Sequence, residues 1–79
     1  MSAQEKFIQA FATALGIPVA DVNDTLTYDG IPQWDSVAHM ALVAELEAAF
    51  DVMMDTDEIL AMNSVAKARE ILTKHGVEF

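Results

Sequence analysis

The 79-residue chain contains no cysteine, and it is poor in proline, glycine and basic residues. Without cysteine it has no disulfide, no thiolate metal ligand and no cysteine nucleophile, so nothing indicates an oxidising compartment and we expect a cytoplasmic protein. It also lacks a basic segment followed by a long apolar run, because its most apolar stretch, Val37 to Ala44, is short and contains His39. The sequence therefore predicts neither a signal peptide nor a membrane span.

Basic side chains are confined to the two ends of the chain: Lys6, Lys67, Arg69 and Lys74. Residues 7–66 contain ten acidic side chains and no Lys or Arg, which accounts for most of the net charge of −9. Such a one-sided field repels nucleic acid and anionic lipid and speeds encounter with basic partners. We therefore expect no nucleic-acid or membrane partner. The alternative interpretation is an acidic surface that only aids solubility.

The chain is short enough to form one small domain, residues 1–79. A domain of this length buries roughly 60% of the surface that its unfolded chain exposes, which leaves little room for a deep enzyme cleft. We therefore expect a compact monomer and not an enzyme.

Four segments combine a helical spacing of apolar residues with start or stop signals at their ends. Two of them follow a capping box, in which Glu stands three residues after Ser or Asp: Ser2 with Glu5, and Asp55 with Glu58. Ser64 is a candidate N-cap for the last segment, and Gly16 and Gly76 are candidate terminators. The predicted helices span residues 3–15, 36–50, 56–61 and 65–75.

Three longer helices and one short one predict an all-α fold, a four-helix bundle. Its expected core consists of apolar residues on one face of each helix: Phe7, Phe11, Leu15, Leu42, Val43, Leu46, Phe50, Ile59, Leu60, Val65, Ile71 and Leu72. The loop over residues 16–35 is long for so small a domain, so we expect its apolar residues to pin it to the bundle.

The helix predicted over residues 36–50 carries two apolar stripes on nearly opposite faces, since each residue turns the helix by about 100°. One stripe is Leu42, Val43, Leu46 and Phe50, and the other is Val37, Met40, Ala41, Ala44 and Ala48. A bundle this small buries only one of them, so the second stripe is a candidate contact surface. The alternative is that the loop over residues 17–34 covers it.

Ser36 stands at the head of this helix, where free backbone N–H groups and the helix dipole favour an anion. His39 is its neighbour on the helix surface, three residues later. A Ser–His hydrolase is not supported, because no glycine-rich elbow, oxyanion-hole donor or orienting acid accompanies the pair. We expect His39 to pack against the core or to lie beside Ser36.

The acidic residues from Asp51 to Glu58 do not form a calcium loop. An EF-hand has glycine at its sixth position and glutamate at its twelfth, and counted from Asp51 these positions hold Thr56 and Met62. We predict no specific metal site, although nonspecific divalent binding fits the charge of this cluster.

The motif Asp35-Ser36-Val37, at the start of an amphipathic helix, resembles the Asp-Ser-Leu signature of acyl carrier proteins and related peptidyl carrier domains. The resemblance covers nearly the whole chain, with its four helices, its length and its acidity. Its further elements are Leu15-Gly16-Ile17-Pro18, Leu26, Phe50-Asp51 and the short helix before Ser64-Val65.

This resemblance implies that a phosphopantetheinyl transferase attaches the 4′-phosphopantetheine arm of coenzyme A to Ser36, and that acyl, aminoacyl or polyketide intermediates ride on the arm as thioesters. Asp35 then helps the transferase and its magnesium ion engage the serine, although a plain N-cap role suits Asp equally well. The other implied partners are an acyl- or aminoacyl-loading ligase and downstream synthase or transferase enzymes.

The resemblance also implies that the second helix meets basic patches on partner enzymes. Positions that are often acidic in the fatty-acid type are here Ala38, Ala41 and Ala48. We therefore expect docking to depend more on apolar contact than on charge, through Val37, Met40, Ala44 and Glu47.

The pathway and the cargo stay open at this point. Trp34 before the motif and Ala38-His39 after it favour a stand-alone carrier of a specialised acyl, polyketide or aminoacyl pathway over the fatty-acid type. By resemblance, an aliphatic chain enters between the second and third helices, whereas aminoacyl and polyketide carriers often leave the cargo outside. The residues expected near such a chain are Leu46, Ile59 and Met62.

The alternative function is an acidic helical protein-interaction module without a prosthetic group. Its adaptable binding surface would be Met40, Met53, Met54 and Met62, for which core filling is the competing interpretation. The mass of the protein distinguishes the two functions, because only a carrier gains phosphopantetheine from coenzyme A.

Overall fold

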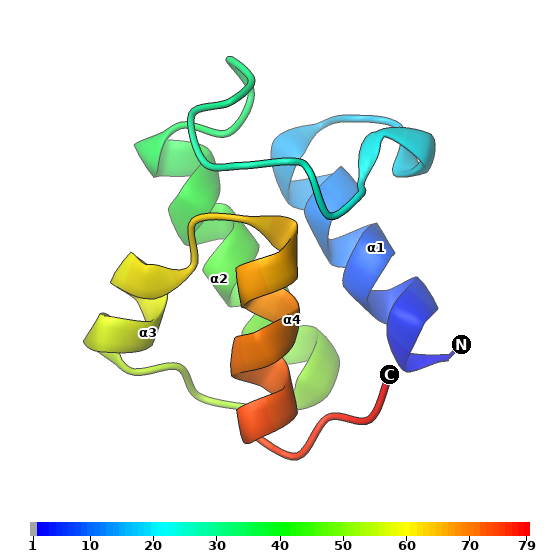
Figure 1. The fold of residues 1–79 in the computed structure, drawn as a ribbon, viewed down its shortest axis with the longest axis vertical. Helices are drawn as coiled ribbons and strands as arrows, with labels where there is room; N and C mark the ends of the chain where they lie inside the picture. Colours follow the sequence, from blue (N-terminus) through cyan, green and yellow to red (C-terminus); the bar gives the residue numbers. More distant parts are fainter. Residues whose placement is uncertain (1) are drawn as a thin grey trace.

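The computed structural model describes residues 2–79, which form four α-helices and one short 3₁₀ helix (Figure 1). The helices are α1 (Ala3–Leu15), η1 (Val19–Asp21, the 3₁₀ helix), α2 (Ser36–Phe50), α3 (Thr56–Ala61) and α4 (Val65–Lys74). The all-α bundle of three longer helices and one short one is confirmed. Two details differ from the prediction: α4 ends one residue earlier, and η1 was not expected.

Side-chain caps set the starts of the helices. Ser2 Oγ accepts a hydrogen bond from the backbone N–H of Glu5 at 3.1 Å, and Asp55 Oδ1 accepts one from Glu58 N–H at 2.8 Å. Both glutamates also accept a hydrogen bond from the backbone N–H of the capping residue, which confirms the two predicted capping boxes. Ser64 caps α4 in the same way. Each cap stabilises its helix by about 1 kcal/mol.

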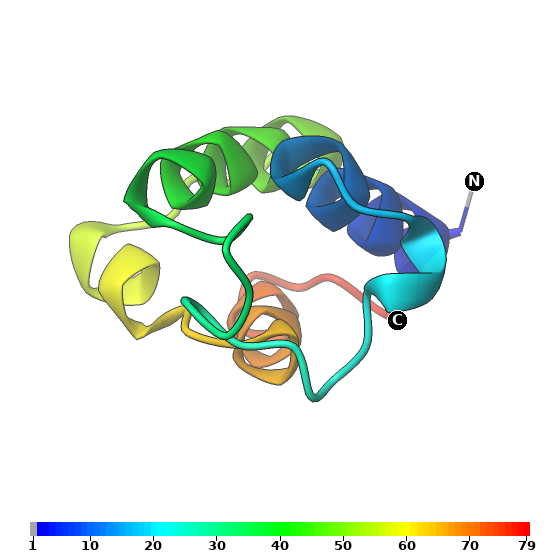
Figure 2. The same cartoon turned by 90° about the horizontal axis from the view of Figure 1, so that it is seen from above.

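α1, α2 and α4 surround the middle of the bundle, and α3 lies at one side (Figures 1 and 2). Large side chains from these helices and from the loop pack together there. The rings of Phe7 and Phe11 lie 5.1 Å apart, and the Phe11 ring meets Trp34 nearly edge-on at 5.4 Å. The largest side chains that are less than 2% exposed are Trp34, Phe7, Phe11, Leu42, Leu46, Met62, Leu72 and Val65. Most of the predicted core is therefore confirmed.

Leu60 is the error in the predicted core, and Trp34 and Met62 are its main omissions. Leu60 is 76% exposed, whereas Met62, two residues later, is 1% exposed. Because α3 has only six residues, fewer than two turns, the spacing of its apolar side chains does not identify its inner face. Phe50 and Ile59 are half-buried at the edge of the core.

The long loop before α2 is pinned to the bundle, as the sequence predicts. Leu26 and Trp34 are buried. The backbone N–H of Tyr28 donates to the carbonyl of Asn63 at 2.9 Å, and Val65 N–H donates to the carbonyl of Leu26 at 3.0 Å. These two hydrogen bonds join the loop to the connection between α3 and α4, at the upper end of α4 in Figure 1.

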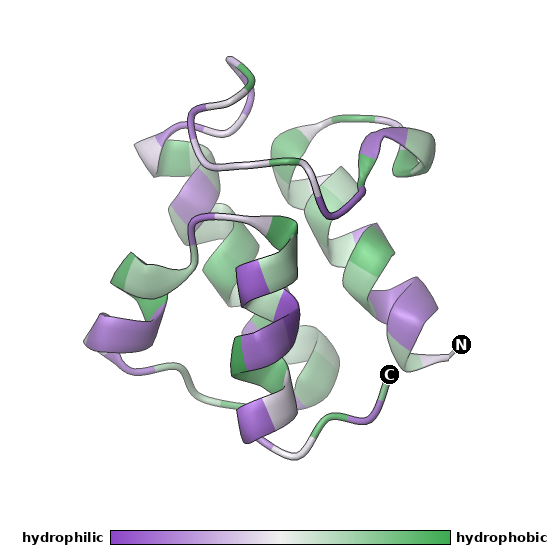
Figure 3. Ribbon diagram, in the orientation of Figure 1, coloured by the Kyte–Doolittle hydropathy of each residue, from purple (hydrophilic) through white to green (hydrophobic). Residues whose placement is uncertain are grey.

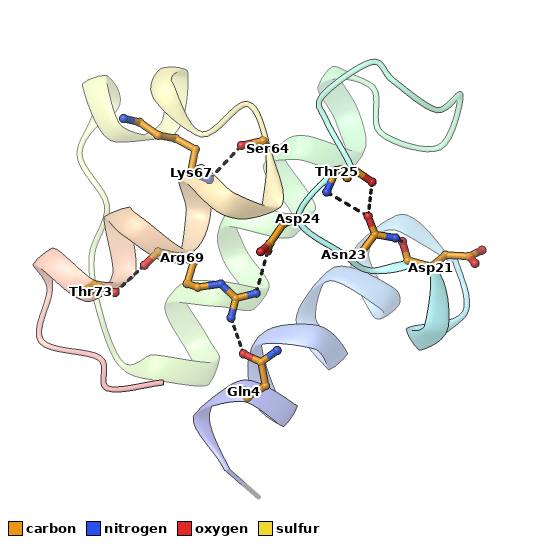
Figure 4. Close-up of polar contacts among 9 residues, drawn as sticks. All are labelled: Gln4, Asp21, Asn23, Asp24, Thr25, Ser64, Lys67, Arg69 and Thr73. Carbon is orange, nitrogen blue, oxygen red and sulfur yellow. Dashed lines mark hydrogen bonds and ion pairs between the residues drawn. The ribbon is translucent and has the colours of Figure 1, made fainter.

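Arg69 of α4 holds three distant parts of the chain together (Figure 4). Its guanidinium donates to Gln4 in α1 and to Asp24 Oδ1 in the loop, the latter at 3.1 Å. The same group lies 4.9 Å from the ring centre of Phe7 and 5.3 Å from that of Phe79. The loop and the C-terminal segment are thereby tied to the pair of α1 and α4.

Apolar residues predominate along α2, while α4 carries hydrophilic segments on its outer side (Figure 3). Even so, within residues 2–79 no helix has both the length and the apolar character needed to cross a membrane.

Candidate functional site

Ser36 is the first residue of α2 and is exposed, next to a set of free backbone donors. Asp35 caps the helix: its Oδ1 accepts the N–H of Ala38 at 2.8 Å, and its carbonyl accepts the N–H of His39 at 2.8 Å. The N–H groups of Ser36 and Val37 have no acceptor within the helix, because they belong to its first turn. Two donors and the positive end of the helix dipole therefore flank the Ser36 side chain.

The Ser36 hydroxyl makes no hydrogen bond to any other described residue, whereas the two other serines of the chain are engaged. The hydroxyls of Ser2 and Ser64 accept backbone N–H groups at the caps of α1 and α4. Ser36 is thus the serine whose oxygen is exposed and without an internal partner among residues 2–79.

His39 does not serve Ser36 as a base, because both of its ring nitrogens are occupied. Trp34 Nε1–H donates to His39 Nδ1 at 3.0 Å, and His39 Nε2 lies 2.8 Å from the carbonyl oxygen of Ile59. Both bonds form together only in the neutral ring with its proton on Nε2. The ring also stacks on Trp34, with centres 6.1 Å apart and planes 23° apart. The structural role of His39 is confirmed.

A cleft of about 360 Å³ opens beside Ser36, between α2 and α3. Its lining is mainly apolar: Tyr28, Ser36, His39, Met40, Ile59, Leu60, Met62 and Asn63. Ile59 and Met62, which the sequence places near a bound chain, line it. Leu46 does not, because it is fully buried in the core.

Tyr28 and Asn63 are site residues that the sequence did not reveal. They lie 35 positions apart in the chain and meet through the backbone hydrogen bond between the loop and the α3–α4 connection. The Tyr28 ring meets the His39 ring nearly edge-on at 5.2 Å. No periodicity or motif reports a contact of this kind, because both residues belong to irregular segments.

Two further polar contacts hold α3 in place. At its start, the Glu47 carboxylate of α2 accepts the backbone N–H of Met54 at 2.9 Å. On its other side, His75 Nε2 lies 2.9 Å from Glu58 Oε1. Together with the contact of His39, these bonds connect α3 to α2 and to the end of α4.

The pKa of Glu58 is set mainly by the hydrogen bonds that its carboxylate accepts. The hydrogen bond from His75 Nε2–H and, to a lesser degree, that from the Asp55 N–H stabilise the carboxylate and hold the pKa of Glu58 below its usual 4.5. The charged form of Glu58 is therefore the one that favours the fold.

The second stripe of α2 faces outward. Val37 is 79% exposed and Met40 is 55% exposed, and Ala41, Ala44 and Ala48 are exposed as well. The loop does not cover this stripe, since its large side chains enter the core instead. The alternative that it does is wrong.

Two of the four methionines of the alternative binding surface fill the core, and the other two are exposed, as a binding surface would require. Met54 and Met62 are 5% and 1% exposed and fill the core, while Met40 and Met53 are exposed. As to metal ions, no group of three or more His, Cys, Asp or Glu side chains within residues 2–79 could hold one.

A family described as "phosphopantetheine attachment site" matches residues 5–71 of the chain. The matched segment contains the whole of α2 and α3, with the Asp35-Ser36-Val37 motif and the residues that line the cleft. Comparison with curated proteins and with solved structures gives no significant match.

Proposed function

Because the chain belongs to the family of proteins with a phosphopantetheine attachment site, we propose that Ser36 bears the arm and that the protein presents acyl groups on it to other enzymes. Membership of this family implies a 4′-phosphopantetheine prosthetic group and a non-catalytic carrier role. It also implies two kinds of partner, a phosphopantetheinyl transferase and acyl-handling enzymes. The arm provides a terminal thiol on which an acyl group is held as a thioester.

The observation that carries the assignment is the free, exposed hydroxyl of Ser36 at the head of α2, beside the cleft. In the attachment, the Ser36 oxygen loses its proton and forms a bond to the β-phosphorus of coenzyme A, while adenosine 3′,5′-bisphosphate leaves. The product is an anionic phosphodiester. It fits this place because the N–H groups of Ser36 and Val37 and the helix dipole stabilise negative charge there.

Intact mass measured after incubation with coenzyme A and a broad-specificity transferase tests this assignment. We expect the wild-type protein to gain one phosphopantetheine and Ser36→Ala to gain none. Ser2→Ala is the matched control, since it removes another exposed serine hydroxyl and is expected to load fully. A wild-type protein that keeps its bare mass would contradict the proposal.

We also assign Asp35 to the engagement of the transferase. Its Oδ1 caps α2, and its other carboxylate oxygen makes no hydrogen bond to a described residue. Asp35 directly precedes Ser36 in the chain, and this oxygen is available to a magnesium ion bound by the transferase. Capping and transferase engagement are therefore compatible in one side chain.

The docking face for partner enzymes is the outer stripe of α2, through Val37, Met40, Ala44 and Glu47. Its exposure and its start beside Ser36 support this choice, and Glu47 marks its far edge, where it also holds Met54. We expect Met40→Glu to slow transfer to or from a partner while the helical circular dichroism is unchanged. Met53→Glu, at a position that is more exposed than Met40 and lies beyond the end of α2, is the control and is expected to leave transfer intact. An unchanged rate of transfer in Met40→Glu would show that partner enzymes do not dock on this stripe.

An aliphatic acyl group is the cargo that suits the cleft, because Met40, Ile59, Leu60 and Met62 make its lining mainly apolar. Binding of such a group to the folded state raises thermal stability by mass action within the molecule. We expect a medium-chain acyl form to melt at a higher temperature than the bare-arm form. Equal melting temperatures would place the cargo outside the bundle, as expected of an aminoacyl carrier.

A further inference from the structure

Ser36 lies within a short stretch of chain whose two ends are bonded to each other. Trp34 stands two residues before Ser36, and His39 stands three residues after it. Trp34 Nε1–H donates to His39 Nδ1 at 3.0 Å, so a side-chain hydrogen bond spans the turn that contains Asp35 and Ser36. The backbone N–H of His39 also donates to the carbonyl of Asp35 at 2.8 Å. The start of α2 is therefore held on both sides of the serine.

Both ends of this stretch are also anchored to the rest of the molecule. Trp34 is fully buried, its carbonyl accepts the N–H of Asp29 at 3.0 Å, and its own N–H donates to the carbonyl of Ile31 at 3.2 Å. At the other end, His39 Nε2–H donates to the carbonyl of Ile59 in α3 at 2.8 Å. The imidazole of His39 is thus the junction of the loop, α2 and α3.

This junction requires a neutral imidazole. Nδ1 accepts the indole N–H with its lone pair, so the proton of the ring is on Nε2. A second proton on Nδ1 would face the indole N–H and leave the buried donor of Trp34 without an acceptor. Such a loss costs roughly a tenfold to hundredfold change in an equilibrium constant. Since histidine ordinarily changes its charge between about pH 5 and 8, the junction is sensitive to mild acid.

No carboxylate among residues 2–79 is paired with His39 to favour a second proton. Asp35, at the start of the same helix, directs its Oδ1 to the backbone as the cap of α2. In α3, the carboxylate of Glu58 is bonded to His75. From the loop, the Tyr28 ring meets the imidazole nearly edge-on at 5.2 Å and brings no charge. Proton uptake at His39 therefore loosens the junction without a compensating ion pair.

We propose that His39 is a positioning residue for the attachment step, whose neutral ring fixes Asp35 and Ser36 in the orientation in which the serine oxygen meets the β-phosphorus of coenzyme A. The proposal rests on the function assigned to Ser36. A fixed turn speeds the reaction, because the freedom of the nucleophile is lost before the transition state is reached. His39 takes no proton from Ser36, since both of its ring nitrogens are engaged, and it acts through the turn that carries the serine.

Two substitutions of His39 test the positioning role when loading by a broad-specificity transferase is followed by mass gain. His39→Phe keeps an aromatic ring but neither hydrogen bond, and we expect kcat to fall about tenfold. KM for the carrier should stay nearly the same, because the outer stripe of α2 is untouched. His39→Gln offers an amide that accepts from Trp34 and donates to Ile59, and we expect it to restore most of the rate. Circular dichroism verifies that each variant is folded at the assay temperature.

The pH profile of loading distinguishes positioning from a merely structural role. The ratio of the wild-type rate to the His39→Gln rate, measured with the same transferase at each pH, cancels the titration of the enzyme. We expect this ratio to be constant at neutral and alkaline pH and to fall as His39 takes up a proton in acid, because glutamine does not titrate. His75→Gln removes the other histidine of the chain and is the matched control, which should keep the wild-type profile.

The chain contains a single Trp, so one indole N–H signal in the ¹⁵N-correlated NMR spectrum reports on the bond to His39. We expect this signal to move upfield as the pH falls, with the same midpoint as the ratio of loading rates. In His39→Phe it should stand upfield already at neutral pH, and in His75→Gln it should follow the wild type.

The outcomes separate the positioning role from the assignment of Ser36. Wild-type kcat in His39→Phe, or a ratio of rates that does not change with pH, would overturn the inference and leave the carrier function standing. A folded His39→Gln that loads as slowly as His39→Phe would overturn it as well. A rise in KM with unchanged kcat would assign His39 to the docking surface instead. A wild-type protein that takes no arm would refute the assignment of Ser36, and the positioning role with it.

Discussion

At the scale of single residues, Asp35 combines a structural contact with the proposed contact to the transferase. Its Oδ1 accepts the N–H of Ala38 at 2.8 Å and caps the helix that bears Ser36. An Asn side chain caps as well as Asp does, whereas Ala does not cap at all. Substitution by Asn therefore removes the charge alone, and substitution by Ala removes both charge and cap.

We predict that Asp35→Ala lowers the free energy of unfolding by about 1 kcal/mol and that Asp35→Asn leaves it nearly unchanged. If the carboxylate engages the transferase's metal ion, both variants load more slowly, by about tenfold for a loss of about 1.4 kcal/mol in the transition state. Urea denaturation and the rate of mass gain measure the two effects. Wild-type loading by Asp35→Asn would leave Asp35 as a cap only.

Glu58 of α3 is bonded to His75 at the end of α4, and this contact makes its negative charge favourable to the fold. Its pKa is lowered, chiefly by the hydrogen bond from His75, so the unfolded chain binds a proton at a pH where the folded chain does not. The stabilisation is therefore present above the usual pKa of 4.5 and disappears as the pH falls through the lower folded value.

We predict that Glu58→Gln lowers the melting temperature at neutral pH and that its curve meets the wild-type curve in acid, once the pH has fallen below the lowered pKa of Glu58. Melting temperature measured against pH checks this. Glu70→Gln, an exposed position of α4, is the control and should follow the wild type throughout. A constant difference between Glu58→Gln and the wild type down to the lowest pH would contradict the sign of the shift.

At the scale of the secondary-structure elements, the helix boundaries were predictable because they depend on local contacts. Ser2, Asp55 and Ser64 bond to N–H groups within the next turn, so a short stretch of sequence suffices to place each start. The inner face of α3 depends instead on distant contacts. Leu60 and Met62 are both apolar and near one another in the chain, and only the tertiary packing decides which is buried.

The contrast between these two residues gives a prediction for α3. Met62→Ala opens a cavity in the core and is expected to lower the free energy of unfolding by about 2 to 5 kcal/mol. Leu60→Ala changes an exposed side chain and is expected to alter it by no more than about 0.5 kcal/mol. Urea denaturation of the two variants measures both values. Equal effects would mean that α3 turns its other face to the core.

The limits of sequence reasoning at the site have the same origin. The position of Ser36 at the head of α2 and the exposure of the outer stripe were predictable, because they follow from a motif and a helical period. The side of the cleft formed by Tyr28 and Asn63 was not, since it arises where a loop pairs with a distant connection. The bond from His39 to Ile59 likewise joins residues 20 positions apart.

At the scale of the whole molecule, the net charge of −9 acts on the fold and on its partners in opposite ways. Repulsion among the acidic side chains destabilises the folded chain, while the same field attracts a basic partner. Both effects are screened by salt, because the Debye length falls from about 30 Å at 0.01 M to about 10 Å at 0.1 M ionic strength. A titration with salt therefore distinguishes the two effects, because added salt stabilises the fold and weakens the attraction of a basic partner.

We predict that raising the ionic strength over this range increases the melting temperature and lowers kcat/KM for loading by the transferase, the latter by about tenfold. Neutralising Glu45 of α2 and Asp51, the residue that follows its last turn, by Glu45→Gln with Asp51→Asn, should make the fall in kcat/KM shallower, because these exposed charges belong to the helix that bears Ser36 and to its C-terminal cap. Neutralising Glu70 and Glu78 removes the same charge far from Ser36 in the chain and should leave the slope nearly as it was. If kcat/KM for loading does not change with salt in any of the three proteins, apolar contact along α2 alone brings the transferase to Ser36.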